Sequence, residues 1–303
     1  MGGAPVNIEI WLWMLLVMLP HNERTMKIVE KYGGVRSAAE AMRDGKCEEL
    51  TEDERLRAVG IRSREVNALI NDCATNGIQI LTIEDEDYPD ILRNIYNPPI
   101  VLFVQGTLEG FNAETALAVV GSRDCSRYAL DMTKDICGEL CKVGMSIISG
   151  LAVGVDTTAH QSALDHGAKT IGVLACGNLV DYPTASRTLK ANIIRSGGAV
   201  ISELPPHTKT DPDYFKHRNR IISGLAMGTF IVEARRNSGC RFTAEHAIQQ
   251  GRELFCMPPY NVKLDECAGV IPFLRDGATP VFGHVDIINA YKYSLFNNMR
   301  DEL

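Results

Sequence analysis

From Val101 onward, short apolar runs alternate with segments of helical periodicity, and this alternation restricts the fold more than any other feature of the chain. The apolar runs are Val101–Gln105, Leu117–Gly121, Ser146–Ser149, Thr170–Ala175, Ala199–Glu203, Thr229–Glu233 and Glu253–Met257. The helical segments between them are Ala129–Val143, Asp156–His166, Thr184–Ser196, Phe215–Leu225 and Thr243–Gln250. Continuous apolar strands separated by helices are typical of a mostly parallel sheet with helices on both faces. The sequence therefore predicts a doubly wound α/β fold.

The chain before Ile78 has a different pattern, in which apolar residues recur at helical spacing without strand-like alternation. Prolines between Ile83 and Val101 indicate an ordered, turn-rich connection. The last twenty residues are typical of a short helix and a frayed end. We therefore expect a small helical domain over residues 1–77, an α/β domain over 78–283 and a C-terminal helix or tail over 284–303.

Composition is that of a globular protein without a large disordered region, with 45% hydrophobic and 23% charged residues. The nine cysteines form no CxxC pair and no Cys/His cluster, so free thiols are expected, with no metal site and no cofactor. The apolar run Ile10–Leu19 is too short to span a bilayer and lacks the features of a secretory signal. A cytoplasmic protein that does not bind membranes is the expectation.

Small and polar residues follow the ends of several predicted strands. In a doubly wound sheet, ligands bind beyond the carboxyl ends of the strands, where these junctions meet. Glycine lets the backbone approach a ligand, serine offers a hydroxyl, and arginine offers a bidentate fork for phosphate. The junctions are Gly121-Ser122-Arg123, the turn from Ser149-Gly150 to Gly154, and Ser238-Gly239 with Thr243 at a helix start.

A basic segment, Phe215–Ala244, surrounds one of these strands in a protein of formal net charge −7. Its basic residues are Lys216, Arg218, Arg220, Arg235, Arg236 and Arg241. Glu233 is the only acidic residue in this segment. Net charge keeps a protein soluble, whereas a local basic cluster selects an anionic partner. Together with the backbone N–H groups at a helix start, the cluster indicates a phosphate-bearing partner.

Generic nucleotide and hydrolase motifs do not fit the chain. Gly121-Ser122-Arg123 lacks the later glycines of a dinucleotide fingerprint, and neither a P-loop nor a GxSxG elbow is present. Asp156 and His160 lie four residues apart on one helix face, where His160 could serve as a general base beside Asp156. The favoured interpretation is structural, with Asp156 as a helix cap and His160 packed or hydrogen-bonded. Glu233 ends a strand at the binding edge, where a structural role is favoured over contact with a sugar hydroxyl.

Five segments resemble successive blocks of the DNA-processing protein A (DprA/Smf) family: AVVGSRDCSRYA, SIISGLAVGVDTTAHQSAL, TIGVLACGNLVDYP, FKHRNRIISGL and IVEARRNSGCRFTAEHAIQQGRELFCMPP. The likeness covers nearly all of residues 88–280, with blocks in the same order and spacing. It implies a Rossmann-like domain preceded by a sterile-alpha-motif-like, helix-hairpin-helix-like domain. It departs from the family at Val153, where an arginine is common. No winged-helix domain, which many members carry, is expected at the C-terminal end.

The resemblance implies a homodimer that binds single-stranded DNA and helps to load the RecA recombinase in natural transformation, without enzymatic activity. The expected DNA-binding residues are Gly121, Ser122, Arg123, Ser149, Gly150, Gly154, Phe215, Lys216, Arg218, Asn219, Arg220, Ser238, Gly239 and Thr243. Within this set, Phe215 is expected to stack on an unpaired base or to pack in the core. Two rivals remain: a LOG-like nucleoside-monophosphate phosphoribohydrolase using Glu233, and an interaction scaffold that no longer binds DNA.

Overall fold

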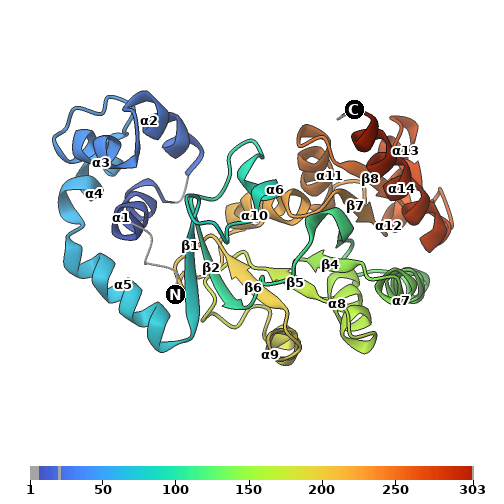
Figure 1. The fold of residues 1–303 in the computed structure, drawn as a ribbon. Coiled ribbons are helices and arrows are strands. Elements are labelled where there is room, and N and C mark those ends of the chain that lie inside the picture. Colours follow the sequence, from blue (N-terminus) through green and yellow to red (C-terminus); the bar gives the residue numbers. More distant parts are fainter. Residues whose placement is uncertain (1–6, 20–21, 302–303) are drawn as a thin grey trace.

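The computed structural model describes residues 7–19 and 22–301, and Figure 1 shows a group of helices beside a large sheet. The helices are α1 (Ile8–Met18), α2 (Thr25–Lys31), α3 (Val35–Arg43), α4 (Glu52–Gly60), α5 (Ser63–Thr75), α6 (Asp90–Arg93), α7 (Arg127–Lys142), α8 (Val155–Asp165), α9 (Arg187–Arg195), α10 (Pro212–Gly224), α11 (Cys240–Gln249), α12 (Asp265–Ala268), α13 (Ile271–Arg275) and α14 (His284–Asp301). Short 3-10 helices cover Asn22–Arg24, Ala113–Thr115 and Thr184–Ser186.

The sheet has the strand order β1-β2-β6-β5-β4-β3-β7-β8-β9. Its strands are β1 (Ile78–Thr82), β2 (Val101–Gly106), β3 (Ala116–Val120), β4 (Ser146–Ser149), β5 (Thr170–Val173), β6 (Ala199–Ser202), β7 (Gly228–Ile231), β8 (Glu253–Cys256) and β9 (Thr279–Pro280). In this order, all neighbouring strands from β6 to β9 pair in parallel. Strand β1 pairs antiparallel with β2, and β2 pairs antiparallel with β6. The predicted Rossmann-like, mostly parallel fold is confirmed. From β3 the chain adds β4, β5 and β6 on one side and then β7, β8 and β9 on the other. The position between β3 and β7 is therefore the topological switch point.

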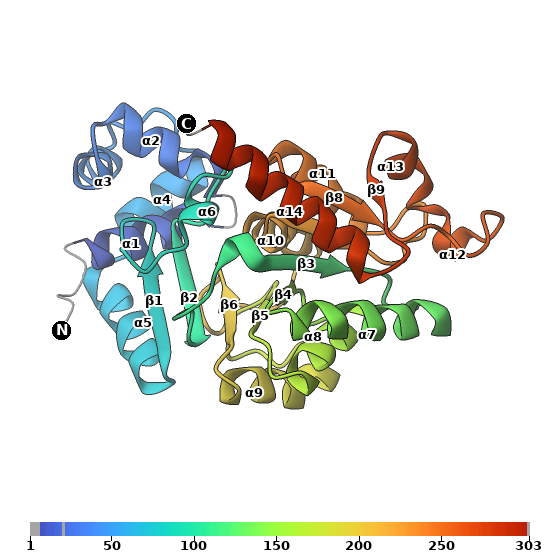
Figure 2. The same cartoon turned by 45° about the vertical axis from the view of Figure 1, so that its right-hand side comes forward.

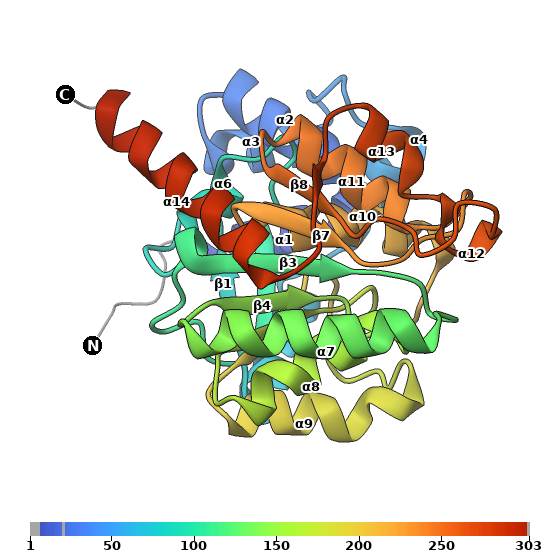
Figure 3. The ribbon, with the colours of Figure 1, turned by 90° about the vertical axis from the view of Figure 1, so that its right-hand side faces the viewer.

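Helices cover both faces of the sheet: α7, α8 and α9 lie on one face, and α10 and α11 on the other (Figure 3). Strand β3 shows why both faces need covering, because its side chains alternate between two cores. Leu117 and Val119 pack in the cluster on the α7 side, while Ala118 and Val120 pack in the cluster on the opposite side. All five residues of β3 are buried, so the strand is a continuous apolar run.

The C-terminal segment is a helix of 18 residues rather than the short helix that the sequence suggested. Helix α14 runs obliquely past β3 (Figure 2). Its residue Tyr291 is buried, stacks on Phe255 of β8 and donates a hydrogen bond of 2.6 Å to the Ala116 carbonyl. These contacts anchor the first half of α14 on the sheet.

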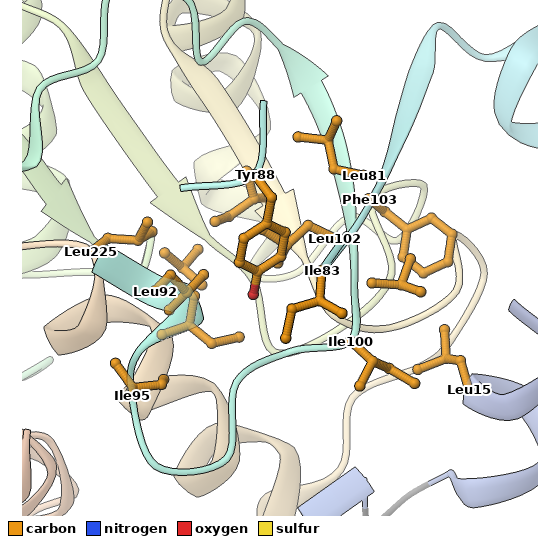
Figure 4. Close-up of a cluster of buried hydrophobic side chains, with 14 of the residues drawn as sticks. Leu15, Leu81, Ile83, Tyr88, Leu92, Ile95, Ile100, Leu102, Phe103 and Leu225 are labelled. Carbon is orange, nitrogen blue, oxygen red and sulfur yellow. The ribbon is translucent and has the colours of Figure 1, made fainter. Parts of the chain in front are cut away.

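The first helices share a hydrophobic core with the sheet. Trp11, Leu12 and Leu15 of α1 belong to the same buried cluster as β1, β2 and α10. Figure 4 shows this cluster, with Leu15 of α1 on one side and Leu225, just after α10, on the other. Because the apolar contacts run continuously from α1 into the sheet, the boundary at residue 77 is a change in secondary structure inside one packed core. The division of the chain into domains stays a prediction.

Most predicted strand and helix boundaries agree with the structure to within a few residues. Helix α10 is one of the larger differences, since it begins at Pro212 rather than Phe215. Asp211 accepts a hydrogen bond from the Asp213 N–H group, and proline occupies the first turn, so a capped start precedes the apolar periodicity. Within the described parts of the chain, no helix combines the length and apolar character needed to cross a bilayer.

Candidate functional site

A pocket of about 340 Å³ opens at the carboxyl edge of the sheet, at the switch point between β3 and β7. Its wall combines the turn after β3, the turn after β4, one face of α10 and the start of α11. The lining residues are Val120, Gly121, Ser122, Arg123, Asp124, Ala152, Asp156, Phe215, Arg218, Asn219, Ile222, Ser238, Gly239, Cys240 and Thr243. The sheet edge that the sequence singled out is therefore hollow.

A smaller pocket of about 110 Å³ adjoins the first, because Arg123, Ala152, Phe215 and Arg218 line both. Its wall is mainly apolar and includes Val153, Leu174 and Tyr182. The ring of Phe215 is half-buried and meets the Tyr182 ring edge-on, with 5.7 Å between the centroids. Phe215 is thus a pocket wall rather than a core residue.

Arg123 is an exposed cation held against an aromatic ring. Its guanidinium carbon lies 5.1 Å from the centroid of the Phe215 ring. A stacked guanidinium keeps its N–H donors free at its edges. Where the structure describes side chains, in residues 7–19 and 23–292, the Arg123 side chain has neither a hydrogen-bond acceptor nor a carboxylate at ion-pairing distance.

Arg218 is a buried cation at the base of both pockets, with 7% of the residue exposed. Its Nη1 donates to the carbonyl oxygen of Gly150 at 2.9 Å and also to that of Val173, and its Nε donates to Asn219 Oδ1 at 3.1 Å. Its Nη2 donates no hydrogen bond within the described residues. Burial lowers the pKa of Arg218 to about 10, which leaves the group charged at neutral pH.

Asp156 balances part of this buried charge without forming a direct ion pair. Its Oδ2 accepts hydrogen bonds from the N–H groups of Gly150 at 3.1 Å and Ala152 at 3.4 Å. Burial raises the pKa of Asp156, while the nearby Arg218 acts in the opposite direction. The carboxylate therefore shapes the turn after β4 and places the Gly150 carbonyl for Arg218.

The basic segment is not the uncompensated cluster that its sequence suggested. Acidic residues from elsewhere in the chain pair with five of its members. The pairs are Lys216 with Asp213, Arg220 with Glu203, Arg235 with Asp124, Arg236 with Asp265, and Arg241 with Glu245. Among the described residues, Arg218 of this segment and Arg123 opposite it are left without such a partner. The two cations that remain both face the pockets.

Arg220 lies away from the pockets, contrary to expectation. It is 4% exposed, and its Nη1 and Nη2 donate to both carboxylate oxygens of Glu203, at 2.9 and 2.6 Å. Its Nε also donates to the Asn97 carbonyl. Bidentate pairing of this kind ties α10 to the end of β6 and leaves the guanidinium occupied.

Three other predicted residues also lie outside the two pockets. The Ser149 hydroxyl is buried and donates to the Val119 carbonyl at 2.6 Å, which joins β4 to β3. Gly154 has a φ of 85°, and a Cβ there would lie 2.5 Å from the Ser122 carbonyl oxygen, so its role is close backbone packing. Lys216 is exposed and bonds to Asp213. The structure places the remaining ten predicted residues on the pocket walls.

The start of α11 forms one side of the larger pocket, as the small-residue turn predicted. Gly239 precedes the helix and Cys240 is its first residue, and both line the pocket. The first N–H groups of a helix have no intrahelical acceptor, so they are available to an anion. Burial raises the pKa of the Cys240 thiol to about 12, which keeps it neutral.

Sequence reasoning missed some of the pocket residues, chiefly Tyr182 and Asp124. Tyr182 follows β5 by several residues, and only the fold brings its ring against Phe215. Asp124 comes directly after Arg123 in the sequence but is not among the expected DNA-binding residues. The structure instead directs its carboxylate to Arg235, at 2.8 Å.

Glu233 and His160 both have structural roles, as favoured from the sequence. Glu233 is 1% exposed, and its two carboxylate oxygens accept hydrogen bonds from the Ser126 N–H group and hydroxyl, at 2.9 and 2.5 Å. Ser126 caps α7, so Glu233 fixes the start of that helix. His160 is fully buried and bonds to Thr170 rather than to Asp156. No group of three potential metal ligands occurs in the described residues.

The buried His160 is expected to make the fold acid-sensitive. Thr170 Oγ1 donates to the Ile147 carbonyl, so it accepts from His160 Nδ1, and Nε2 carries the lone pair without a partner. Burial lowers the pKa of His160 from 6.5 to about 3. Between these values only the unfolded chain binds the proton, so stability falls as pH falls, by up to about 1.4 kcal/mol per unit.

Urea unfolding of the wild type and of His160→Asn from pH 7 to pH 4 checks this prediction. Asparagine keeps a donor toward Thr170 but does not titrate. We expect the unfolding free energy of the variant to fall less steeply as pH falls, with a slope that corresponds to about one proton fewer taken up on unfolding. Equal slopes for the two proteins would show that His160 does not contribute.

Comparisons with known proteins agree with the fold. The family model described as DNA recombination-mediator protein A matches residues 79–292. DNA processing protein DprA of Bacillus subtilis is 35% identical over 216 residues, which cover 70% of each chain. DprA of Streptococcus pneumoniae is 36% identical over 213 residues, covering 70% of this chain and 74% of the relative.

Solved structures give the same result. DNA processing protein A from Streptococcus pneumoniae superposes with a TM-score of 0.80 and 28% identity, covering 93% of this chain and 97% of that one. DNA processing protein A from Helicobacter pylori, described for its single-stranded DNA binding mode, gives a TM-score of 0.63 and 28% identity, covering 71% and 97%. With more than half of its length matched by the family model, the chain belongs to the DNA recombination-mediator protein A family, whose curated members are named DprA or Smf.

Proposed function

We propose that this protein binds single-stranded DNA at the carboxyl edge of its sheet. The observation that supports the proposal most strongly is the pair Arg123 and Arg218, which flank the Phe215 ring and lack carboxylate partners among the described residues. Guanidinium groups with free donors bind phosphate oxygens strongly, and more so where a partner carboxylate does not compete. Arg218 Nη2 and the edges of Arg123 offer such donors.

The aromatic wall supports a single strand rather than a duplex. A ring such as Phe215 can stack only on a base whose face is free, and bases in a duplex are already stacked. Phe215 and Tyr182 meet beside the smaller, mainly apolar pocket, which offers space for one such face. Because every base has a stacking face, we expect little dependence on sequence.

The family resemblance supports further parts of the proposal. We propose a cytoplasmic homodimer that protects incoming single strands and helps to load RecA on them during natural transformation. Two linked sites raise the effective affinity for one strand, because the second contact becomes intramolecular. The division into a helical domain over residues 1–77 and a DNA-binding domain over 78–283 also stays a proposal.

We propose binding without catalysis, in preference to a nucleoside-monophosphate hydrolase. A LOG-like hydrolase would need Glu233 to reach a sugar, whereas its two oxygens bond to Ser126 at the start of α7. Of the two carboxylates that line the larger pocket, Asp156 accepts two backbone hydrogen bonds and Asp124 pairs with Arg235. The scaffold alternative would require DNA affinity to be independent of Arg123.

The test is a titration of a labelled short oligo-dT strand, followed by fluorescence anisotropy. Arg123→Ala is expected to weaken binding about tenfold or more, because one charge-assisted contact to phosphate contributes about 1.5–3 kcal/mol. Arg241→Ala serves as the matched control, since Arg241 pairs with Glu245 and does not line the pockets. Equal losses in the two variants, or none in either, would contradict the proposed site.

A further inference from the structure

A second pocket of about 340 Å³ lies in the helical part of the chain, where sequence reasoning identified no functional residue. It is formed by α1, the end of α3 and the start of α5. Its lining residues are Glu9, Ile10, Trp13, Arg43, Ile61, Arg62, Ser63 and Val66. Two arginines and one glutamate make its lining net positive in a protein whose overall charge is negative.

The guanidinium of Arg43 lies over an aromatic ring in this pocket, as that of Arg123 does at the sheet edge. Its guanidinium carbon lies 4.3 Å from the centroid of the Trp13 ring. Trp13 is 2% exposed, and its Nε1 donates to the Ile61 carbonyl at 3.2 Å, so the ring is a fixed support. Among the residues whose side chains the structure describes (7–19 and 23–292), the side chain of Arg43 has no hydrogen-bond acceptor and no carboxylate partner. Its donors are therefore positioned but unoccupied.

Arg62 places a second cation on the same pocket, next to the first residue of α5. Its guanidinium likewise has no ion-pair partner in the described parts of the chain. Helix α5 is 13 residues long and its Ser63 lines the pocket, while the Glu65 carboxylate accepts a hydrogen bond of 3.0 Å from the Arg62 N–H group and offsets part of the positive end of the helix. Glu9 is the one acidic residue in the lining and opposes an anion there.

We propose that this pocket binds a phosphate of the DNA backbone, as a second contact for a strand held at the sheet edge. The inference rests on the proposed binding of single-stranded DNA. The argument is the shared chemistry, since each site combines a guanidinium stacked on an aromatic ring, a second unpaired arginine and a helix start. Phosphate contacts of this kind position a strand without reading its sequence.

The experiment compares the double variant Arg43→Ala/Arg62→Ala with the wild type on oligo-dT strands of about 6 and about 40 nucleotides. We expect the double variant to bind the long strand about tenfold more weakly, with a salt slope shallower by about 0.7, which corresponds to one lost phosphate contact. The short strand, which fills only the sheet-edge pocket, should bind unchanged. Arg64→Ala is the matched control, because Arg64 is on the same turn of α5, pairs with Glu65 and does not line the pocket.

Glu9→Gln provides a test in the opposite direction that loss of folding cannot imitate. Removing the one acidic group of the lining should tighten binding of the long strand by several-fold and leave the short strand unchanged. Long-strand binding that is unaffected in all these variants, while short-strand binding still depends on Arg123, would overturn the inference and leave the proposed function standing. Binding of an oligo-glutamate peptide that the double variant loses, with DNA affinity unchanged, would also overturn it in favour of an acidic protein partner.

Discussion

Replacing Glu203 by alanine is expected to lower the free energy of unfolding by about 3–5 kcal/mol, one of the two largest effects that the structure predicts. Arg220 is 4% exposed, and its guanidinium donates to both Glu203 carboxylate oxygens. Without Glu203 that charge stays buried with no partner, and the desolvation of the charge is no longer offset. Urea unfolding monitored by circular dichroism measures the change.

The exposed pair Arg241–Glu245 gives the matched control for this prediction. Both of its side chains are about half exposed, and they lie four residues apart on α11. Glu245→Ala should therefore change the unfolding free energy by less than about 0.5 kcal/mol. If Glu203→Ala were as mild as this control, Arg220 would not depend on its pairing, and its exclusion from the proposed DNA site would lose its physical reason.

The second large effect is expected from Gly150→Ala, a change of one methyl group that should weaken binding of short oligo-dT about 10- to 100-fold. A Cβ at Gly150 would lie 2.6 to 2.8 Å from three guanidinium atoms of Arg218. Arg218 cannot simply turn aside, because it is buried and bonds to two backbone carbonyls. The displaced guanidinium would lose its contact with phosphate, which contributes about 1.5–3 kcal/mol.

Gly239→Ala is the control for the methyl group itself. Gly239 lines the same pocket and has a φ of −62°, and nothing lies within 4 Å of a Cβ built there. We expect its DNA affinity to stay within about twofold of the wild type. Anisotropy titrations measure the affinity of both variants for short oligo-dT, and circular dichroism verifies that they fold. Normal binding by Gly150→Ala would show that the position of Arg218 does not matter.

The sheet and the position of the pockets at its carboxyl edge could be predicted because each depends on local patterns. Continuous apolar runs such as that of β3 are needed wherever helices cover both faces, and small residues such as Gly121 and Gly150 follow strands where the backbone is crowded. The carboxyl ends of parallel strands meet at one edge. Ten of the fourteen expected site residues therefore line the two pockets.

The pairing of charges could not be predicted, because it depends on contacts between residues far apart in the chain. Asp124 is 111 residues from Arg235, its partner, and Glu203 and Arg220 are joined only by the packing of α10 on the sheet. The antiparallel direction of β2 and the position of Arg43 over Trp13 likewise arise from tertiary packing. Sequence patterns identify a basic segment, but the fold decides which of its cations remain available.

The measurement that tests the central claim most directly is the salt dependence of short oligo-dT binding. If Arg123 and Arg218 each neutralise one phosphate, the logarithm of the association constant should fall against the logarithm of salt concentration with a slope near −1.4. The sequence alone, with about four phosphate contacts expected, suggested a slope near −3. Arg123→Ala should bring the slope close to −0.7. A slope near zero for the wild type, or one unchanged in Arg123→Ala, would contradict the account.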